Sequence, residues 1–513
     1  MRLGNDLVNI YQTLRDARVE LSERIVNVES CWNRTRWQLE FIQRIWPTLS
    51  EAHQSIQEEI LKILKSKLES ADKKLSKLLK RPTEPNESNG PRPAVRRWKY
   101  LFVKSYLDET IKSLNKWQAI YDPSWYLIIR VASPIIDAEL DRPQTAVSRD
   151  ATNVWKTAAQ IRSTLQKGAA SYEHLFLDRK GLDSTKAYHI PYSSARHIQR
   201  LGSDKWFIVD PVPCLANAYV GLMSKDIRVL AAKLHHADPS TFGVLRCRGA
   251  VKVNRNSNGR LIAFDLVFET STTEKPRTLR SCLVQRTPHS LTERLELARQ
   301  LAKSVNYVHT LDFVHKNVRP DNLVGFGDTH LGSFYLVGFE QVRSAEGMSY
   351  MQGDTDWQKN LYRHPSRQGL SLDQPYCMQH DIYSLGVCLL EIGLWESFVV
   401  YGPAGQPPLP NTTMLRASIE ELQKKNPRQV KDLLVYLAKR DIPQAMGDIY
   451  SEVVVNCLTC LDEDNVDFGD STDFEGADGI AVGLRYIEKK IDLRGVDLAH
   501  WLHAADTEYS HTA

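Results

Sequence analysis

The stretch from Val314 to Glu340 constrains the fold of this chain more than any other. It begins with VHKNVRPDNLV and ends with YLVGFE. The residues before it, Leu291–Thr310, carry apolar side chains at positions 295, 298, 301, 305 and 308, a spacing that predicts a helix. The chain therefore places a predicted helix directly before a proline-containing loop that is rich in polar residues.

Two downstream segments complete a recognisable order. YRHPS occupies 362–366 and DIYSLGV occupies 381–387. In this order, the helix, the loop and these two segments resemble eukaryotic protein kinases, whose signatures include H-R-D-x-x-x-x-N and D-F-G. The resemblance implies an α+β chain with a bilobal protein-kinase-like domain over residues 191–505. It gives Pro365 and Asp381 structural roles, because the matching aspartate in the family accepts backbone N–H groups of the catalytic loop.

The segment that resembles the catalytic and metal-binding loops has residues that match the family pattern, but it lacks the two aspartates of that pattern. His315 matches the family histidine and Asn322 the metal-binding asparagine, but Asn317 stands at the catalytic aspartate. Gly338, followed by Phe339 and Glu340, stands at the aspartate of D-F-G. An asparagine amide is no base, and Mg²⁺ prefers carboxylate oxygen. Since phosphoryl transfer depends on positioning and charge stabilisation, we expect a vestigial loop with no catalytic residue and no metal site.

The segment that should form the N-terminal lobe lacks three further parts. Between Tyr192 and Asp210 the only glycine is Gly202, so no glycine-rich turn closes over phosphates. Asp210 falls where the family has its strand lysine. No glutamate occurs between Glu173 and Glu269, so the lysine–glutamate pair cannot be restored by shifting the alignment.

Residues 261–269 resemble the fifth strand of the lobe. The resemblance makes Phe268 the gatekeeper and starts the hinge at Glu269 and Thr270, where backbone groups could pair with an adenine. A carboxylate at Asp210 would repel a triphosphate. We therefore expect that the chain requires no cofactor and binds ATP weakly or not at all.

Composition limits the class of protein. The 513 residues are 42% hydrophobic and 25% charged, as in soluble globular proteins of two to three domains. A net charge of +4 is too small to argue for a nucleic-acid partner. The sequence starts without an apolar leader and has no long uncharged apolar run, so we expect a cytoplasmic protein. Cys457 and Cys460 form a CxxC inside an apolar run, which favours core cysteines over a metal site.

Apolar residues recur at helical spacing through residues 1–140 and predict an antiparallel helical bundle. Proline-rich residues 81–95 predict an exposed loop, and Asp122-Pro123-Ser124 predicts the start of a new helix. Residues 141–190 are expected to form a brace or linker that contains a helix. Acidic residues 462–478 predict a loop, 480–491 a closing helix and 506–513 a C-terminal tail.

The bundle resembles the HeLo-like bundles that fungal chains place before kinase-like domains, and that of the mixed-lineage kinase-like executioner of necroptosis. The similarity rests on WNRTRWQLE at 32–40 and on the helical pattern. It implies either a partner-binding bundle or a membrane-permeabilising one. Residues 1–30 carry balanced charge, which gives no excess attraction to anionic lipid.

These observations predict a regulatory pseudokinase that acts in signalling or as a scaffold, with a helical bundle that binds protein partners. Peripheral membrane contact and oligomerisation stay open. Two alternatives remain: an active ATP-dependent Ser/Thr-type protein kinase with divergent motifs, and a membrane-permeabilising cell-death effector controlled by its pseudokinase.

Overall fold

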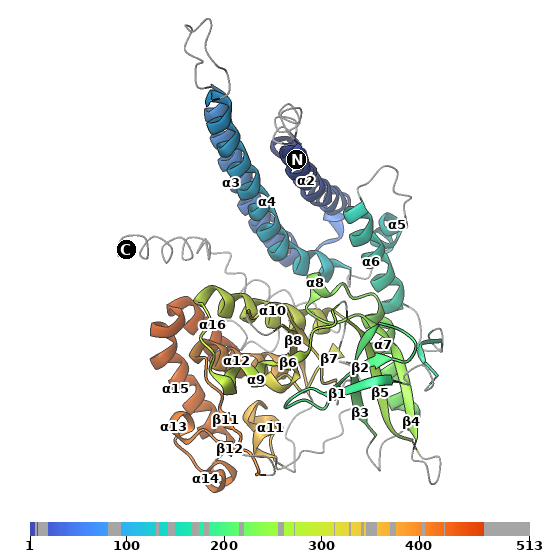
Figure 1. Ribbon diagram of the computed structural model, residues 1–513, viewed down its shortest axis with the longest axis vertical. Helices are drawn as coiled ribbons and strands as arrows, with labels where there is room; N and C mark the ends of the chain where they lie inside the picture. Colours follow the sequence, from blue (N-terminus) through green and yellow to red (C-terminus); the bar gives the residue numbers. More distant parts are fainter. Residues whose placement is uncertain are drawn as a thin grey trace, which may run out of the picture. The chain divides into compact units, whose positions relative to one another are not determined.

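The computed structural model forms two compact units, Met1–Arg162 and Ser163–Ala513 (Figure 1). Long helices and antiparallel sheets confirm the mixed α+β class. Of the loop expected at 81–95, residues 81–93 lie outside the described residues, and residues 94 and 95 begin helix α4. All features expected after residue 465 also lie outside the described residues. The structure describes residues 1–5, 8, 19–80, 94–129, 133–141, 149–166, 172, 174–178, 184–214, 220–254, 261–270, 272–311, 313–327, 330–339, 343–344, 356–369, 376–402, 406–424 and 426–465.

The first unit is helical. Helices α3 and α4 run side by side in opposite directions, and α2 also packs against α4 (Figure 1). Their seam is apolar and aromatic, with Trp117, Tyr121 and Trp125 of α4 fully buried. The helices are α2 (Val19–Ile45), α3 (Glu51–Lys80), α4 (Ala94–Ile128), α5 (Pro134–Leu140) and α6 (Arg149–Gln166), with a 3₁₀ turn η2 (Trp46–Thr48) after α2.

Helix α4 continues through Pro123, where the sequence predicts a new helix start; that prediction is wrong. Trp117, Tyr121 and Trp125 lie on one buried face that spans the proline, and their packing outweighs the loss of one backbone hydrogen bond. The side chain of Asp122 does not cap a helix. It accepts hydrogen bonds from Arg34 Nη2 at 2.6 Å and Gln38 Nε2 at 3.1 Å, which joins α4 to α2.

The second unit begins with a five-stranded antiparallel sheet in the order β1-β2-β3-β5-β4. Strand β1 begins at Ser184, before residue 191, because the polar run STKAYH pairs with β2 although it has no apolar alternation. Helix α7 packs against β4. The elements are β1 (Ser184–His189), β2 (Arg196–Arg200), β3 (Trp206–Pro213), α7 (Val220–His235), α8 (Pro239–Phe242), β4 (Cys247–Asn254) and β5 (Leu261–Glu269).

The remainder of this unit is mainly helical and surrounds α12 (Met378–Leu394), which is buried from Met378 to Gly393. Cys457 and Cys460 are buried and form no disulfide, as expected for core cysteines. Small strands flank the candidate loop: β6 (Pro276–Thr278), β8 (Leu323–Phe326) and β9 (Phe334–Leu336) form one sheet, and β7 (Phe313–Val314) pairs with β10 (Arg343–Ser344). The main helices are α9 (Leu279–Gln285), α10 (Leu291–Thr310), α15 (Pro427–Met446) and α16 (Asp448–Leu458).

Shorter elements complete the unit: η5 (Pro320–Asn322), α11 (Trp357–Leu361), η6 (Pro365–Arg367), β11 (Val399–Val400), β12 (Leu409–Pro410), α13 (Thr412–Leu415) and α14 (Ile419–Lys424). None of the helices within the described ranges is long and apolar enough to cross a membrane.

Candidate functional site

Asp381, in the first turn of α12, holds the backbone of the loop that follows β7. The fully buried carboxylate of Asp381 accepts the backbone N–H of His315 at 2.6 Å and of Lys316 at 2.8 Å. His309 Nε2 lies 3.0 Å from the same carboxylate and Tyr376 Oη donates to it at 2.7 Å. Burial alone would raise the pKa of Asp381, but the contact with His309 lowers it below its usual range. Asp381 therefore holds the loop backbone through hydrogen bonds to a carboxylate that its partners favour in the charged form.

The side chains of the two loop asparagines, Asn317 and Asn322, both donate hydrogen bonds to backbone oxygens. Asn317 Nδ2 donates to Gly338 O at 3.0 Å, and Asn322 Nδ2 donates to Asn317 O at 2.7 Å. Gly338 has a φ of +83°, and a Cβ built on it would overlap the side-chain amide of Asn322. The space that a metal-binding side chain at position 338 would need is therefore filled by Asn322.

Asp210 of β3 also bonds to the segment around Gly338. Its buried carboxylate oxygen Oδ2 accepts the backbone N–H of Gly338 at 2.9 Å and of Phe339 at 3.0 Å. A lysine at this position would present a donor to these N–H groups and could not make either bond. This carboxyl group is thus built into the sheet and holds the segment at 338–339.

Phe339 closes the site with aromatic packing. Its buried ring stacks on Phe268, with ring centroids 5.9 Å apart, and lies 4.7 Å from the ring of His315. Burial lowers the pKa of His315 to about 4, so this imidazole is neutral at neutral pH. Glu340, which the sequence placed beside Phe339, lies outside the described residues.

The expected hinge residues follow Phe268 at the end of β5. Glu269 forms an ion pair with Arg248 at 2.6 Å, and Thr270 Oγ1 donates to Trp206 O at 3.0 Å. Pro365 begins the 3₁₀ turn η6, well separated in the chain from these residues. The structure thus brings His315, Asn317, Asn322, Gly338, Phe339 and Phe268 together. Asp210 bonds to the backbone at Gly338, and Asp381 bonds to the backbone at His315.

The turn between β1 and β2 bonds to the second half of the unit, a contact that sequence reasoning missed. Thr278 Oγ1 donates to Pro191 O at 2.9 Å, and the ring of Tyr192 lies 4.4 Å from that of Tyr401. Between the neighbouring strands β2 and β3, the buried His197 ring stacks on Trp206 with centroids 4.4 Å apart. No local pattern in the polar turn residues signals either contact.

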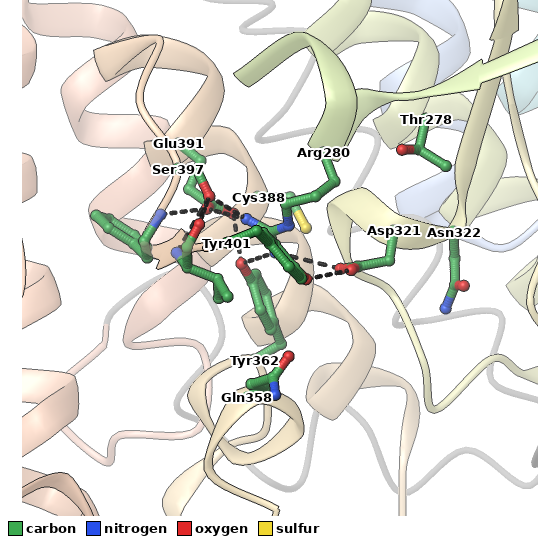
Figure 2. Close-up of polar contacts among 12 residues, drawn as sticks. Thr278, Arg280, Asp321, Asn322, Gln358, Tyr362, Cys388, Glu391, Ser397 and Tyr401 are labelled. Atoms are coloured by element: carbon green, nitrogen blue, oxygen red, sulfur yellow. Dashed lines mark hydrogen bonds and ion pairs between the residues drawn. The ribbon is translucent and has the colours of Figure 1, made fainter. Parts of the chain in front are cut away.

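A buried cluster of charges lies beside the loop (Figure 2). Arg280 of α9 donates to Glu391 Oε1 at 2.7 Å and to Asp321 Oδ2 at 3.2 Å. Tyr362 Oη accepts from Arg280 at 2.5 Å, and Tyr401 Oη donates to Asp321 Oδ1 at 3.2 Å. Burial disfavours a charged guanidinium, but Asp321 and Glu391 raise the pKa of Arg280 above its ordinary value, so it stays charged. Sequence patterns gave no sign of this cluster, because its members come from five separate segments.

Within the described parts of the chain, no group of three or more His, Cys, Asp or Glu side chains is arranged to hold a metal ion.

Comparison with known proteins supports a protein-kinase-like relationship. The chain is 26% identical over 101 residues to the Raf homolog serine/threonine-protein kinase of Caenorhabditis elegans. The aligned residues make up 19% of this chain and 12% of that kinase, so the chain spans only a small part of the length of the relative it matches. No family model matches the chain.

Proposed function

We propose that this chain is a regulatory pseudokinase, a protein-kinase-like domain that signals or scaffolds without transferring phosphate. The observation that carries the proposal is the contact of Asp210 with the backbone N–H groups of Gly338 and Phe339. In an active kinase, a strand lysine and a metal-binding aspartate stand at these two places. Here an anion replaces the cation, and a glycine replaces the anion.

Electrostatics support the same conclusion. Two unit charges about 4 Å apart interact by about 4 kcal/mol at an effective dielectric near 20. A lysine at this position would attract a phosphate by an interaction of this size. An aspartate, as at position 210 in this chain, would repel it instead. The amide of Asn322 adds a steric barrier, because it fills the space beside Gly338 where a carboxylate for Mg²⁺ would stand.

The remaining residues have a structural use that needs no nucleotide. Asn317 and Asn322 bond to backbone oxygens, and Asp381 accepts backbone N–H groups. These bonds give the loop one rigid shape, which suits a surface that partners recognise. We propose that the helical first unit binds protein partners and that the kinase-like unit regulates this binding, without need for a cofactor.

The purified full chain should transfer no labelled phosphate from ATP to itself or to generic protein substrates, in the presence of Mg²⁺ or Mn²⁺. The assay should include an active kinase as a positive control and the Asn322→Ala variant as a matched negative. If the wild type incorporated phosphate and the Asn322→Ala variant did not, the chain would have an active catalytic site and the pseudokinase proposal would be wrong.

A further inference from the structure

A short segment, His174–Asp178, docks on the edge of the five-stranded sheet just before the sheet begins in the chain. We call it the strap. Leu177 N donates to Ala250 O of β4 at 2.8 Å, and Phe176 pairs with Ala250 as a parallel bridge. Strand β4 is the last strand in the sheet order, so the strap covers an edge that would otherwise present backbone groups.

The strand is shaped to receive the strap. Gly249 has a φ of +148°, and a Cβ built on it would overlap the backbone oxygen of Leu175. The pairing of β4 with β5 also shifts register between Cys247 and Gly249. A glycine is needed here because the two backbones approach too closely for any side chain.

Side chains on both sides of the strap complete the contact. Leu177 packs against the apolar cluster of Ile198, Phe207, Val209, Val251 and Val267. The ring of Phe176 stacks on Phe264 with centroids 6.0 Å apart, while Arg228 and Lys252 place their cations 5.2 Å and 4.3 Å from its centroid. Arg228 belongs to α7, so Phe176 joins this helix to the sheet.

Helix α7 reaches from the strap to the base of the candidate loop. The ammonium of Lys233, near the end of α7, donates to Leu311 O at 2.5 Å and lies 4.5 Å from the centre of the Phe313 ring. Leu311 caps α10 and Phe313 begins β7, which leads directly into His315. A continuous set of contacts therefore runs from Phe176 through α7 to the loop.

We propose that the strap is a releasable regulatory element. When the strap is docked, it holds α7 against β4 and thereby stabilises the loop at 313–316. When the strap is released, α7 and this loop both become more mobile. A segment of five residues attached at the edge of a sheet opens at a lower free-energy cost than the sheet itself. Since the strap directly precedes β1, events that displace the preceding chain would reach the loop by this route. This inference does not depend on whether nucleotide binds.

Hydrogen exchange of the full chain, resolved to short peptides, tests the proposal. Gly249→Ala should speed exchange in the strap by at least about tenfold, because its Cβ displaces Leu175. Exchange in α7 and in residues 311–316 should also accelerate. The control is Gly202→Ala, which also replaces a glycine of positive φ, here +70°, but has nothing within 4 Å of the added Cβ. This control should leave the strap and α7 at wild-type rates.

A second variant, Phe176→Ala, releases the strap without altering the backbone of β4 and serves if Gly249→Ala does not fold. Faster exchange in the strap, α7 and residues 311–316 in either variant supports the relay. Faster exchange in the strap alone would show a local cover with no regulatory link. Wild-type protection of the strap in both variants would show that these contacts do not hold it. Either of these last two results overturns the proposal.

Discussion

Replacing Arg280 with alanine is expected to lower the free energy of unfolding by about 3–5 kcal/mol. The guanidinium has 1% of its side-chain surface exposed and pairs with Glu391, whose side chain is 0% exposed, and with Asp321 at 7%. Without it, two buried carboxylates lose their counter-charge, and Tyr362 and Ser397 lose a donor. Urea unfolding of the full chain, followed by circular dichroism, measures the loss.

Arg286, one residue beyond the end of the same helix, provides the matched control. It pairs with Glu396, but its side chain is 62% exposed. Solvent-exposed pairs contribute about 0–1 kcal/mol, so Arg286→Ala should shift the unfolding midpoint little. If Arg280→Ala destabilised the protein no more than Arg286→Ala, the buried cluster would not contribute to stability as the structure indicates.

Replacing Asp381 with alanine should be nearly as damaging. Its carboxylate accepts the backbone N–H groups of His315 and Lys316 and the hydroxyl of Tyr376. Each buried donor left without a partner costs about 1–3 kcal/mol, so the total should reach several kcal/mol. Thermal unfolding should therefore show a much larger drop for Asp381→Ala than for Asn317→Ala, which removes one donor to Gly338 O.

Asp381→Asn separates charge from geometry, since the amide keeps one acceptor oxygen. The melting temperature of Asp381→Asn should lie between those of the wild type and Asp381→Ala. Equal melting temperatures for Asp381→Ala and Asn317→Ala would contradict a structural role for this carboxylate.

The sequence predicted the order of the main elements in the second unit because each has a local signal. The apolar spacing of Leu291–Thr310 corresponds to α10, and DIYSLGV falls in α12. It also singled out Asp210 and Gly338 as unusual residues. Local patterns could not show that these two residues contact each other, because they are far apart in the chain and meet only in the folded protein.

Sequence reasoning missed three features, each for a different physical reason. Strand β1 is polar, so its pairing with β2 leaves no apolar alternation to read. The partners of Arg280 are far away in the sequence. From sequence alone, a single arginine in a helix is expected to be exposed to solvent. Pro123 normally ends a helix, and only the buried aromatic residues on either side of it keep α4 continuous.

The most direct test of the pseudokinase proposal is calorimetric titration of the full wild-type chain with ATP, with and without Mg²⁺, and with adenosine for comparison. The proposal predicts that ATP binds weakly or not at all and that Mg²⁺ does not change the result, because a carboxylate at Asp210 would repel phosphates and a glycine at 338 has no side chain to bind the metal. Adenosine, which has no phosphate, should bind at least as well as ATP. Tight ATP binding that requires Mg²⁺ would contradict the account and favour an active kinase with divergent motifs.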